Sequence, residues 1–303
     1  MRWLFRSSAA AVLVVALVVA VHFPYATDSE PSREEVRRTI AFYNQAYAAP
    51  QAGKDEDIYV KTAEEAAKGI RVKEDLQDFI RLHGLQNKKA LDVGAGQGYL
   101  QDVVDDYTAL DISPTAKRFY HKPFVLGSAT AMPFPDNQFD VVWSIWVLEH
   151  IPNPEQALRE MRRVVKNGGM LYLFPAWSAA TWAGDGYPAR PYSDFPLPGK
   201  LVKASIPIRS SLPFLGMYTI PVRLMRLAAY EAAWPTRLRY RRLTPNFERY
   251  WMPDSDAVSS IDRYEGQLWF ASRGDECLNC RSAWNSAFDR VRDARLMIRV
   301  HKD

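Results

Sequence analysis

The chain has 303 residues, of which 24% are charged and 48% are hydrophobic, and its formal net charge at pH 7 is +4. This composition is typical of a globular protein and excludes collagen-like, coiled-coil and fully disordered chains. Two cysteines are too few for a disulfide-rich scaffold, and the lack of a basic tail or low-complexity tract argues against a dedicated nucleic-acid binder. The length is enough for one large domain or two small ones.

Residues 1–26 predict contact with a membrane. Arg2 and Arg6 precede an uncharged, mostly apolar run over residues 7–21, as in a secretory signal or a single-pass anchor; a buried core helix is a third interpretation. Pro24 disfavours cleavage after Ala26, so we expect an uncleaved anchor with the rest of the chain on the cytoplasmic face. Basic residues are nearly balanced on the two sides of the run, which leaves export of the chain as the alternative.

Residues 27–88 predict two helices. Ser32 and Glu35 have the spacing of a capping box before the first helix, and Thr62 and Glu65 have it before the second. Gly84 should end the second helix. The apolar face of that second helix would consist of Leu76, Phe79, Ile80 and Leu82.

Short apolar runs alternate with helical stretches through residues 89–175, a pattern typical of βαβ units in a parallel, doubly wound sheet. The predicted strands are Ala90–Val93, Thr108–Leu110, Phe124–Leu126, Phe139–Ile145 and Met170–Phe174. The clearest amphipathic helix spans residues 155–166, and Asn167-Gly168-Gly169 should end it.

Residues 251–303 are expected to complete this core. Asp262 and Glu265 repeat the capping-box pattern before a helix that should reach Gly274. Two further strands are predicted around residues 276–280 and 296–301.

A glycine-rich segment, Asp92–Gly98 (DVGAGQG), follows the first predicted strand and should open a helix. Glycines here let the backbone turn and approach a ligand closely. Asp111 ends the next strand 19 residues after Asp92, where a carboxylate suits the two hydroxyls of a ribose. The dinucleotide fingerprint needs glycine at Tyr99, and Asp92 would repel a pyrophosphate. Asp92 suits a sulfonium or ammonium instead, which favours S-adenosylmethionine.

Residues 89–175 resemble the class I S-adenosylmethionine-dependent methyltransferases of the small-molecule "type 11" family. The matching stretches are LDVGAGQGYL, ALDIS, AMPFPDNQFDVVWS and VLEHIPNPEQALREMRRVVKNGGMLYL. The resemblance implies a Rossmann-like fold with a seven-stranded, mostly parallel sheet, and S-adenosyl-L-methionine as cofactor. It places Asp92, Gly94 and Gly96 around the methionine part, Asp111 at the ribose, Ser128 and Ala129 at the adenine, and the backbone of Ser144 or Ile145 at the amino group, with Ala95, Gly98 and Ile112 completing the set.

Two features depart from the family pattern. Ser128, in GSATAMPF, stands where the family commonly has an acidic residue to hold the adenine amino group. A serine hydroxyl can accept one hydrogen bond there but carries no charge. The helix expected between Gly98 and Asp111 is also about one turn shorter than is typical of the family.

Methyl transfer needs a base only when the acceptor must lose a proton. His150, in LEHIP at the mouth of the crevice, is the candidate base; the alternative is that His150, like Glu149, packs the loop after the fourth strand. Cys277 and Cys280 form a single CxxC without further ligands at zinc spacing. We predict neither a metal site nor a disulfide there, because strand positions three apart point to opposite faces.

Residues 176–250 form a proline-rich, aromatic insert that should roof the acceptor pocket as a helical lid. Residues 196–245 hold nine Lys or Arg against one acidic residue. The nine are Lys200, Lys203, Arg209, Arg223, Arg226, Arg237, Arg239, Arg241 and Arg242. A basic, apolar stretch suits an anionic membrane surface; a solvated basic face and nucleic-acid binding are the alternatives.

Together these features predict a membrane-anchored methyltransferase that acts on a small, lipophilic or membrane-presented acceptor. The competing hypothesis is a non-catalytic domain of the same fold that scaffolds a membrane complex. Export of the chain would favour this second hypothesis, since S-adenosylmethionine is scarce outside the cytoplasm.

Overall fold

The computed structural model describes residues 8, 10, 12, 32–48, 58–232, 236–249, 252–290 and 295–302. The predicted anchor, residues 1–26, therefore lies outside the described residues except for Ser8, Ala10 and Val12. No helix in the described part of the chain is both long enough and apolar enough to cross a membrane.

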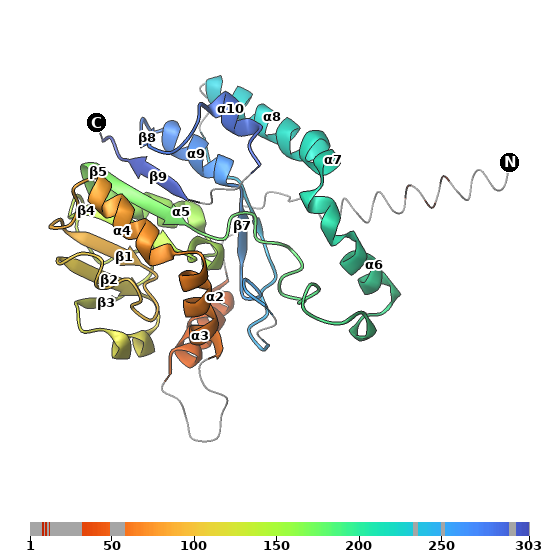
Figure 1. The fold of residues 1–303 in the computed structure, drawn as a ribbon, viewed down its shortest axis with the longest axis horizontal. Helices are drawn as coiled ribbons and strands as arrows, with labels where there is room; N and C mark the ends of the chain where they lie inside the picture. Colours follow the sequence, from red (N-terminus) through yellow and green to blue (C-terminus); the bar gives the residue numbers. More distant parts are fainter. Residues whose placement is uncertain are drawn as a thin grey trace.

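A seven-stranded sheet forms the centre of the molecule, with strand order β3-β2-β1-β4-β5-β9-β8 (Figure 1). The strands are β1 Ala90–Val93, β2 Tyr107–Asp111, β3 Phe124–Leu126, β4 Phe139–Ile145, β5 Val165–Phe174, β8 Glu276–Cys277 and β9 Leu296–Arg299. The first five are parallel, whereas β9 runs antiparallel to both β5 and β8. The predicted seven-stranded, mostly parallel Rossmann-like sheet is confirmed.

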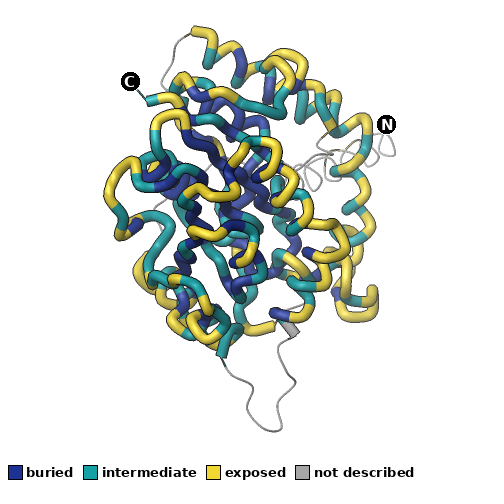
Figure 2. Tube along the Cα trace, turned by 60° about the vertical axis from the view of Figure 1, so that its left-hand side comes forward, coloured by how far each residue is buried: buried dark blue, intermediate teal, exposed yellow. Residues whose placement is uncertain are grey.

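Helices cover both faces of this sheet. Helix α4 (Val72–Leu82) packs Leu76, Phe79 and Ile80 against one face. Helices α5 (Pro154–Val164) and α9 (Arg263–Ala271) cover the other, where Met161 and Trp269 are fully buried. Figure 2 shows the buried positions concentrated in this layered part of the chain.

The two predicted N-terminal helices are three in the structure. Helix α2 (Arg33–Ala46) has the predicted capping box: the Glu35 amide donates to Ser32 Oγ at 3.1 Å, and the Ser32 amide donates to the Glu35 carboxylate at 2.6 Å. The predicted start at Thr62 is wrong, because α3 (Ile58–Gly69) already contains that residue. Arg71, with φ 58°, separates α3 from α4, and Leu82 is exposed rather than part of the apolar face.

The helix predicted after the glycine-rich segment is absent. Residues 97–106 form turns and bends, and the chain then enters β2 at Tyr107. The crossover between β1 and β2 spans residues 94–106, which is little more than the roughly 10–12 residues that a crossover with a helix needs. The glycine-rich loop takes up residues 94–98, and the remaining segment buries Leu100 and Val104 against the sheet without completing a helical turn.

Two other helix boundaries also differ from the predictions. Helix α5 ends at Val164 instead of 166, and Asn167-Gly168-Gly169 lies inside β5. A Cβ on Gly169 would stand 2.8 Å from the Asp140 carbonyl oxygen, so this glycine serves strand packing. Helix α9 has Asp262 as its N-cap but no complete capping box, because the Glu265 carboxylate binds Arg226 instead.

Cys277 and Cys280 form a disulfide, contrary to the prediction of two ordinary cysteines. The strand argument fails because β8 ends at Cys277 and the next two residues form a bend. The bend brings the two Cα atoms to 5.4 Å, within the usual range for a disulfide.

The insert contains helices that extend away from the sheet on the right of Figure 1. Its elements include α6 (Leu197–Ser205), α7 (Leu212–Phe214), α8 (Ile220–Glu231) and β6 (Tyr240–Arg242), which pairs with β7 (Ser259–Ile261). Three of its arginines form ion pairs with other parts of the protein. The interpretation of the basic residues as a fully solvated face is therefore wrong. These ion pairs are Arg223 with Asp262, Arg226 with Glu265, and Arg242 with Glu35.

Candidate cofactor and acceptor site

The carboxyl ends of β1 and β4 border two adjoining cavities. The sheet continues from β1 to β2 and from β4 to β5, so the cavities lie where the strand order reverses, the usual ligand site of such sheets. The first cavity, of about 260 Å³, is lined by the predicted residues Asp111, Ile112, Ser128 and Ala129. The second, of about 320 Å³, is lined by Asp92, Gly94, Ala95, Gly96 and Ile145. Both share the walls Tyr47, Tyr59, Gly94, Trp146 and His150, so we describe them as one crevice.

Gly94 shows why the loop after β1 needs glycine. Its φ is +73°, and a Cβ there would lie 2.4 Å from Cγ2 of Val147. Val147 follows β4, so the loops after two neighbouring strands touch at this point. Because a β-branched side chain cannot give way easily, the close approach requires a residue without a side chain.

Two predicted cofactor residues do not line the crevice. Ser144 is buried, and its hydroxyl donates to the Val93 carbonyl oxygen at 3.1 Å, which ties β4 to β1. Gly98 has φ +73°, and a Cβ there would lie 3.0 Å from the Tyr120 ring, so it shapes the turn behind the crevice.

Asp111 is held by the loop that it faces. Its two carboxylate oxygens accept hydrogen bonds from the Gly96 amide at 2.9 Å and the Ser113 amide at 2.8 Å. Burial raises the pKa of Asp111, and these amide hydrogen bonds partly offset that effect. Each oxygen of a carboxylate can accept a second hydrogen bond, so Asp111 can still receive two hydroxyls.

Asp92 is a buried acid at the floor of the second cavity. The Tyr107 hydroxyl donates to its carboxylate at 2.9 Å. Burial raises the pKa of Asp92 to about 7, although hydrogen bonds to the carboxylate oppose the increase. A cation bound beside Asp92 would favour its ionised form.

Ser128, the departure from the family pattern, is engaged in its own turn. Its Oγ lies 2.9 Å from the Thr130 hydroxyl and accepts the Thr130 amide at 3.2 Å. Both residues line the first cavity.

Helix α2 roofs the crevice, a role that sequence reasoning did not assign to it. Tyr43 of this helix and Tyr47, the residue that follows its end, line the cavities. The Asn44 side chain accepts from Ser113 Oγ at 2.9 Å, and Arg118 donates to the Tyr47 carbonyl oxygen at 2.8 Å. The sequence could not reveal this role, because it depends on contacts with residues about seventy positions later.

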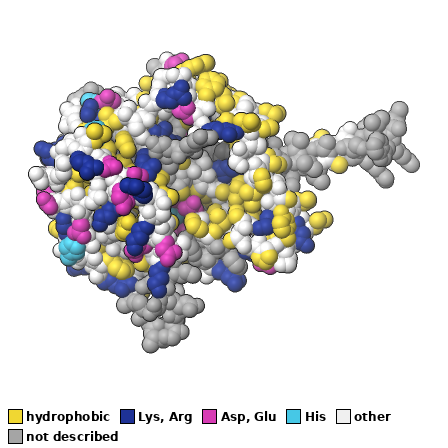
Figure 3. Space-filling view, in the orientation of Figure 1, with side chains coloured by type: hydrophobic (Ala, Val, Ile, Leu, Met, Phe, Trp, Pro, Cys, Tyr) yellow, Lys and Arg dark blue, Asp and Glu magenta, His cyan; other side chains and the backbone are white. Residues whose placement is uncertain are grey.

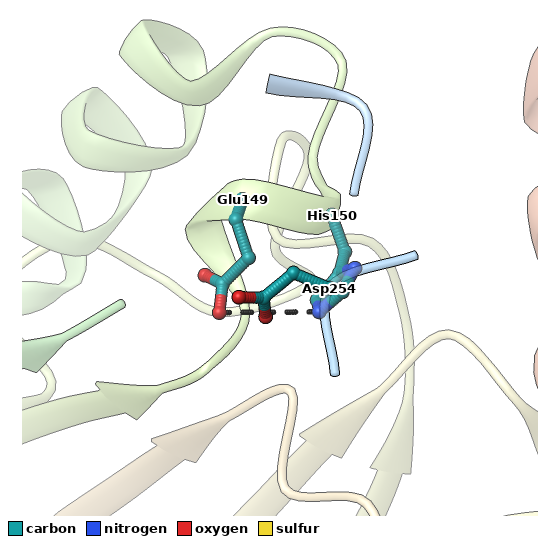
Figure 4. A group of neighbouring side chains, drawn as sticks. All are labelled: Glu149, His150 and Asp254. Carbon is teal, nitrogen blue, oxygen red and sulfur yellow. Dashed lines mark ion pairs between the residues drawn. The ribbon is translucent and has the colours of Figure 1, made fainter. Parts of the chain in front are cut away.

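His150 lies among three carboxylates at the wall of the second cavity. Its Nδ1 is 3.4 Å from Asp256 Oδ2, and its Nε2 is 3.9 Å from Glu149 Oε1. Asp254 completes the group, as the side chains drawn in Figure 4 show. Asp256 also accepts a hydrogen bond from the Tyr43 hydroxyl at 2.8 Å. Sequence reasoning missed both aspartates; the only signal was Asp-Ser-Asp in a loop.

The charges in this group depend on one another. Burial raises the pKa of Glu149 to about 7 and also raises the pKa of Asp254. Burial alone would lower the pKa of His150, but the carboxylates of Asp256 and Glu149 outweigh it and raise that pKa.

Apart from Ala176, the described residues of the insert do not line the crevice, contrary to the predicted lid. Helices α7 and α8 line a separate cavity of about 780 Å³, with Arg209, Arg239 and Glu265 among its walls. The crevice is bordered instead by α2, α3 and the loop that contains Asp254 and Asp256.

Comparison with known proteins agrees with the sheet and the crevice. The family model described as "Methyltransferase domain" matches residues 91–173. Residues 91–173 are therefore similar to a methyltransferase domain.

Several relatives share this domain. A demethylmenaquinone methyltransferase of Renibacterium salmoninarum is 41% identical over 97 residues, which are 28% of this chain and 40% of the relative. A sterol 4-C-methyltransferase of Caenorhabditis elegans is 30% identical over 104 residues, 29% of this chain and 31% of the relative. The chain thus spans about two fifths or less of the length of these curated relatives.

A solved structure from Methanococcus maripaludis is described as an S-adenosyl-L-methionine-dependent methyltransferase. It is 21% identical, with a TM-score of 0.35, over 42% of this chain and 68% of that chain.

The residues of the crevice fit S-adenosylmethionine. Asp92 offers a buried carboxylate to a sulfonium or ammonium, and Asp111 retains lone pairs for two ribose hydroxyls. Gly94 has no side chain to cover the backbone between these two acids, so a ligand can approach the backbone there. The amide groups of the loop after β1 are therefore presented by turns rather than by a helix N-terminus.

Proposed function

We propose that this protein transfers the methyl group of S-adenosylmethionine to a small, lipophilic acceptor. The observation that carries the proposal is the junction of the two cavities. Acids suited to the two ends of the cofactor lie on either side of it, and Tyr47, Tyr59, Trp146 and His150 form its walls.

The chain's contribution to the reaction would be mainly positional. S-adenosylmethionine carries an activated methyl group, so the protein has to align donor and acceptor at about 3 Å and exclude water. Asp92 and Asp111 would fix the two ends of the cofactor, and Gly94 would let the loop backbone approach it. Helix α2 would cover the reacting groups, with Tyr47 between them and the solvent.

An apolar acceptor suits the remaining walls of the first cavity. They include the side chains of Val36, Tyr43, Val147, Ile151 and Pro152. The names of two relatives describe methylation of a demethylmenaquinone and of a sterol, both lipophilic. We infer that the acceptor here belongs to the same broad chemical class.

Presentation of that acceptor by a membrane is the finer part of the proposal, with the sheet domain on the cytoplasmic side. Figure 3 shows hydrophobic side chains gathered over the insert on its right, in contrast to the mixed charges over the sheet domain on its left. Exposed apolar residues of the insert are Leu197, Leu201, Leu212, Met217 and Met225. The exposed Lys200 lies among them on α6. Apolar side chains flanked by lysine are typical of segments that bind membrane surfaces.

Binding of the cofactor is the first test. Titration of S-adenosylmethionine into the full chain in detergent should give micromolar affinity, and Asp111→Asn should weaken it at least tenfold. The substitution removes the charge from the hydrogen bonds to the ribose. Asp102→Asn, at an exposed acid outside the crevice, is the matched control. An unchanged affinity for Asp111→Asn would refute the ribose assignment, and no binding by the folded wild type would favour the scaffold hypothesis.

A further inference from the structure

The group formed by Glu149, His150 and Asp254 contains more buried acceptors than donors. Glu149 Oε1 accepts the Ala176 amide at 3.0 Å, but Glu149 Oε2 is buried without a hydrogen-bond partner. The Glu149 side chain is only 1% exposed, and Figure 4 shows its carboxylate directed toward Asp254 and His150. A buried carboxylate oxygen without a donor is costly, so a positive partner is missing from this group.

The three side chains lie close enough to approach a common ion. The ligand atoms of the three residues all lie within 4.8 Å of one another. The 3.9 Å between His150 Nε2 and Glu149 Oε1 is too long for a hydrogen bond. Metal ligands with bonds of about 2.1 Å lie roughly 3.0–4.2 Å apart, so this separation suits two ligands of one cation.

The second ring nitrogen of His150 lies near a carboxylate, although the two atoms do not form a hydrogen bond. His150 Nδ1 faces Asp256 Oδ2 at 3.4 Å, which leaves Nε2 directed at the other two residues. Asp256 is itself buried and held by the Tyr43 hydroxyl. A carboxylate behind a histidine fixes the orientation and tautomer of the ring and makes the opposite nitrogen a better ligand.

We propose that Glu149, His150 and Asp254 bind a divalent cation at the wall of the crevice. One imidazole and two carboxylates suit Mn²⁺, Fe²⁺ or Zn²⁺, and three protein ligands leave coordination positions open. His150 and Asp254 line the second cavity, so these positions face the crevice. The cation would hold an oxygen of the acceptor beside the methyl donor. This catalytic role rests on the proposed function, whereas binding of the ion does not.

Sequence alone could not indicate this site. Glu149 and His150 follow β4, whereas Asp254 lies more than a hundred residues later, in the loop before β7. The spacing matches no metal-binding motif, and only the fold brings the three side chains together.

Titration with Mn²⁺, followed by the paramagnetic resonance signal of the free ion, tests the proposal on the full chain without cofactor. We expect one ion per chain, and Asp254→Asn should weaken binding at least tenfold because it replaces an anionic ligand. Asp254 is the most suitable ligand to change because it is not fully buried. The matched control is Asp102→Asn, which alters an exposed carboxylate that also pairs with a histidine, His121, at 2.9 Å. This control should leave the affinity unchanged.

Two results would overturn the proposal. One is no saturable binding of Mn²⁺, and none of Zn²⁺, by the folded wild type. The other is an equal affinity in Asp254→Asn and Asp102→Asn. If Asp254→Asn does not fold, Asp254→Glu replaces it. Glutamate keeps the negative charge but moves the carboxylate by one methylene group, so the affinity for Mn²⁺ should still change.

Cofactor binding by the same samples separates this proposal from the proposed function. Asp111→Asn should lose affinity for S-adenosylmethionine while it still binds Mn²⁺ as the wild type does, because Asp111 is not one of the three proposed ligands. If the wild type binds only one of the two ligands, Mn²⁺ or S-adenosylmethionine, the missing binding identifies the proposal that has failed.

Discussion

Asp92 combines a cost to folding with a benefit to binding. The folded protein holds its proton up to about pH 7, whereas an unfolded chain releases it near pH 4. Folding therefore takes up a proton between these values, and the stabilisation present below pH 4 is lost as the pH rises to 7. Above pH 7 the buried charge remains, available to a cationic ligand.

Asp92→Asn should separate these two effects. At pH 8 we expect a higher free energy of unfolding than in the wild type, by at most about 4 kcal/mol, and little difference below pH 4. S-adenosylmethionine should bind more weakly to the variant, and the wild type's increase in affinity between pH 6 and pH 8 should be reduced. Denaturant unfolding and calorimetric titration at these pH values check the prediction. A variant that is less stable at pH 8 would contradict the raised pKa.

Helix α2 is the element that closes the crevice. Its last turn is attached to the crevice through Tyr43, which donates to Asp256, and through Asn44, which accepts from Ser113. Most of its other residues are exposed, and only Thr39 and Tyr43 are buried. An element with so little buried surface opens at low free-energy cost, which would allow the cofactor to enter beneath it.

Ligand binding should therefore stabilise α2 selectively. We expect amide hydrogen exchange in residues 33–46 to slow at least tenfold when S-adenosylmethionine saturates the protein. Exchange in α6, which lies on the insert away from the crevice, should be unaffected and serves as the internal control. Equal protection of both helices would indicate a general stabilisation, and unchanged exchange in α2 would contradict its role as the roof.

At the scale of elements, the sequence predicted what depends on local pattern. Short apolar runs located β1, β3 and β4 to the residue, because strands of a parallel sheet are short and apolar. The sequence pattern did not predict the break between α3 and α4, because that break depends on the left-handed backbone of a single residue, Arg71. Asp92 and Asp111 were found through a local motif. Asp254 and Asp256 were not, because their role depends on a distant loop packing against β4.

Across the whole molecule, mixed charges and exposed apolar side chains lie on different parts of the surface. The sheet domain carries interspersed acids and bases, whereas exposed leucines and methionines gather on the insert (Figure 3). Several of the insert's arginines are used for internal pairs. These arginines are less available to anionic lipids than the net charge of the insert suggests. Binding to a membrane would therefore depend mainly on the exposed apolar side chains.

Flotation with vesicles of phosphatidylcholine and phosphatidylglycerol tests this distribution. Replacing Leu197, Leu201 and Met217 with asparagine should reduce the vesicle-bound fraction at least threefold, because exposed apolar side chains drive insertion into the interface. The matched control replaces Leu82, Leu126 and Phe288, which are exposed outside the insert. An equal effect of both sets would contradict membrane binding through the insert.

The hydrogen bond between Tyr43 and Asp256 joins residues 213 positions apart. During synthesis, the strands that border the crevice leave the ribosome long before Asp256 does, and domains generally fold as the chain emerges. The roof can therefore dock only after about five sixths of the polypeptide has been made. A nascent chain would carry the sheet with an open, solvated crevice, and ligand capture would become a late event in the life of the protein.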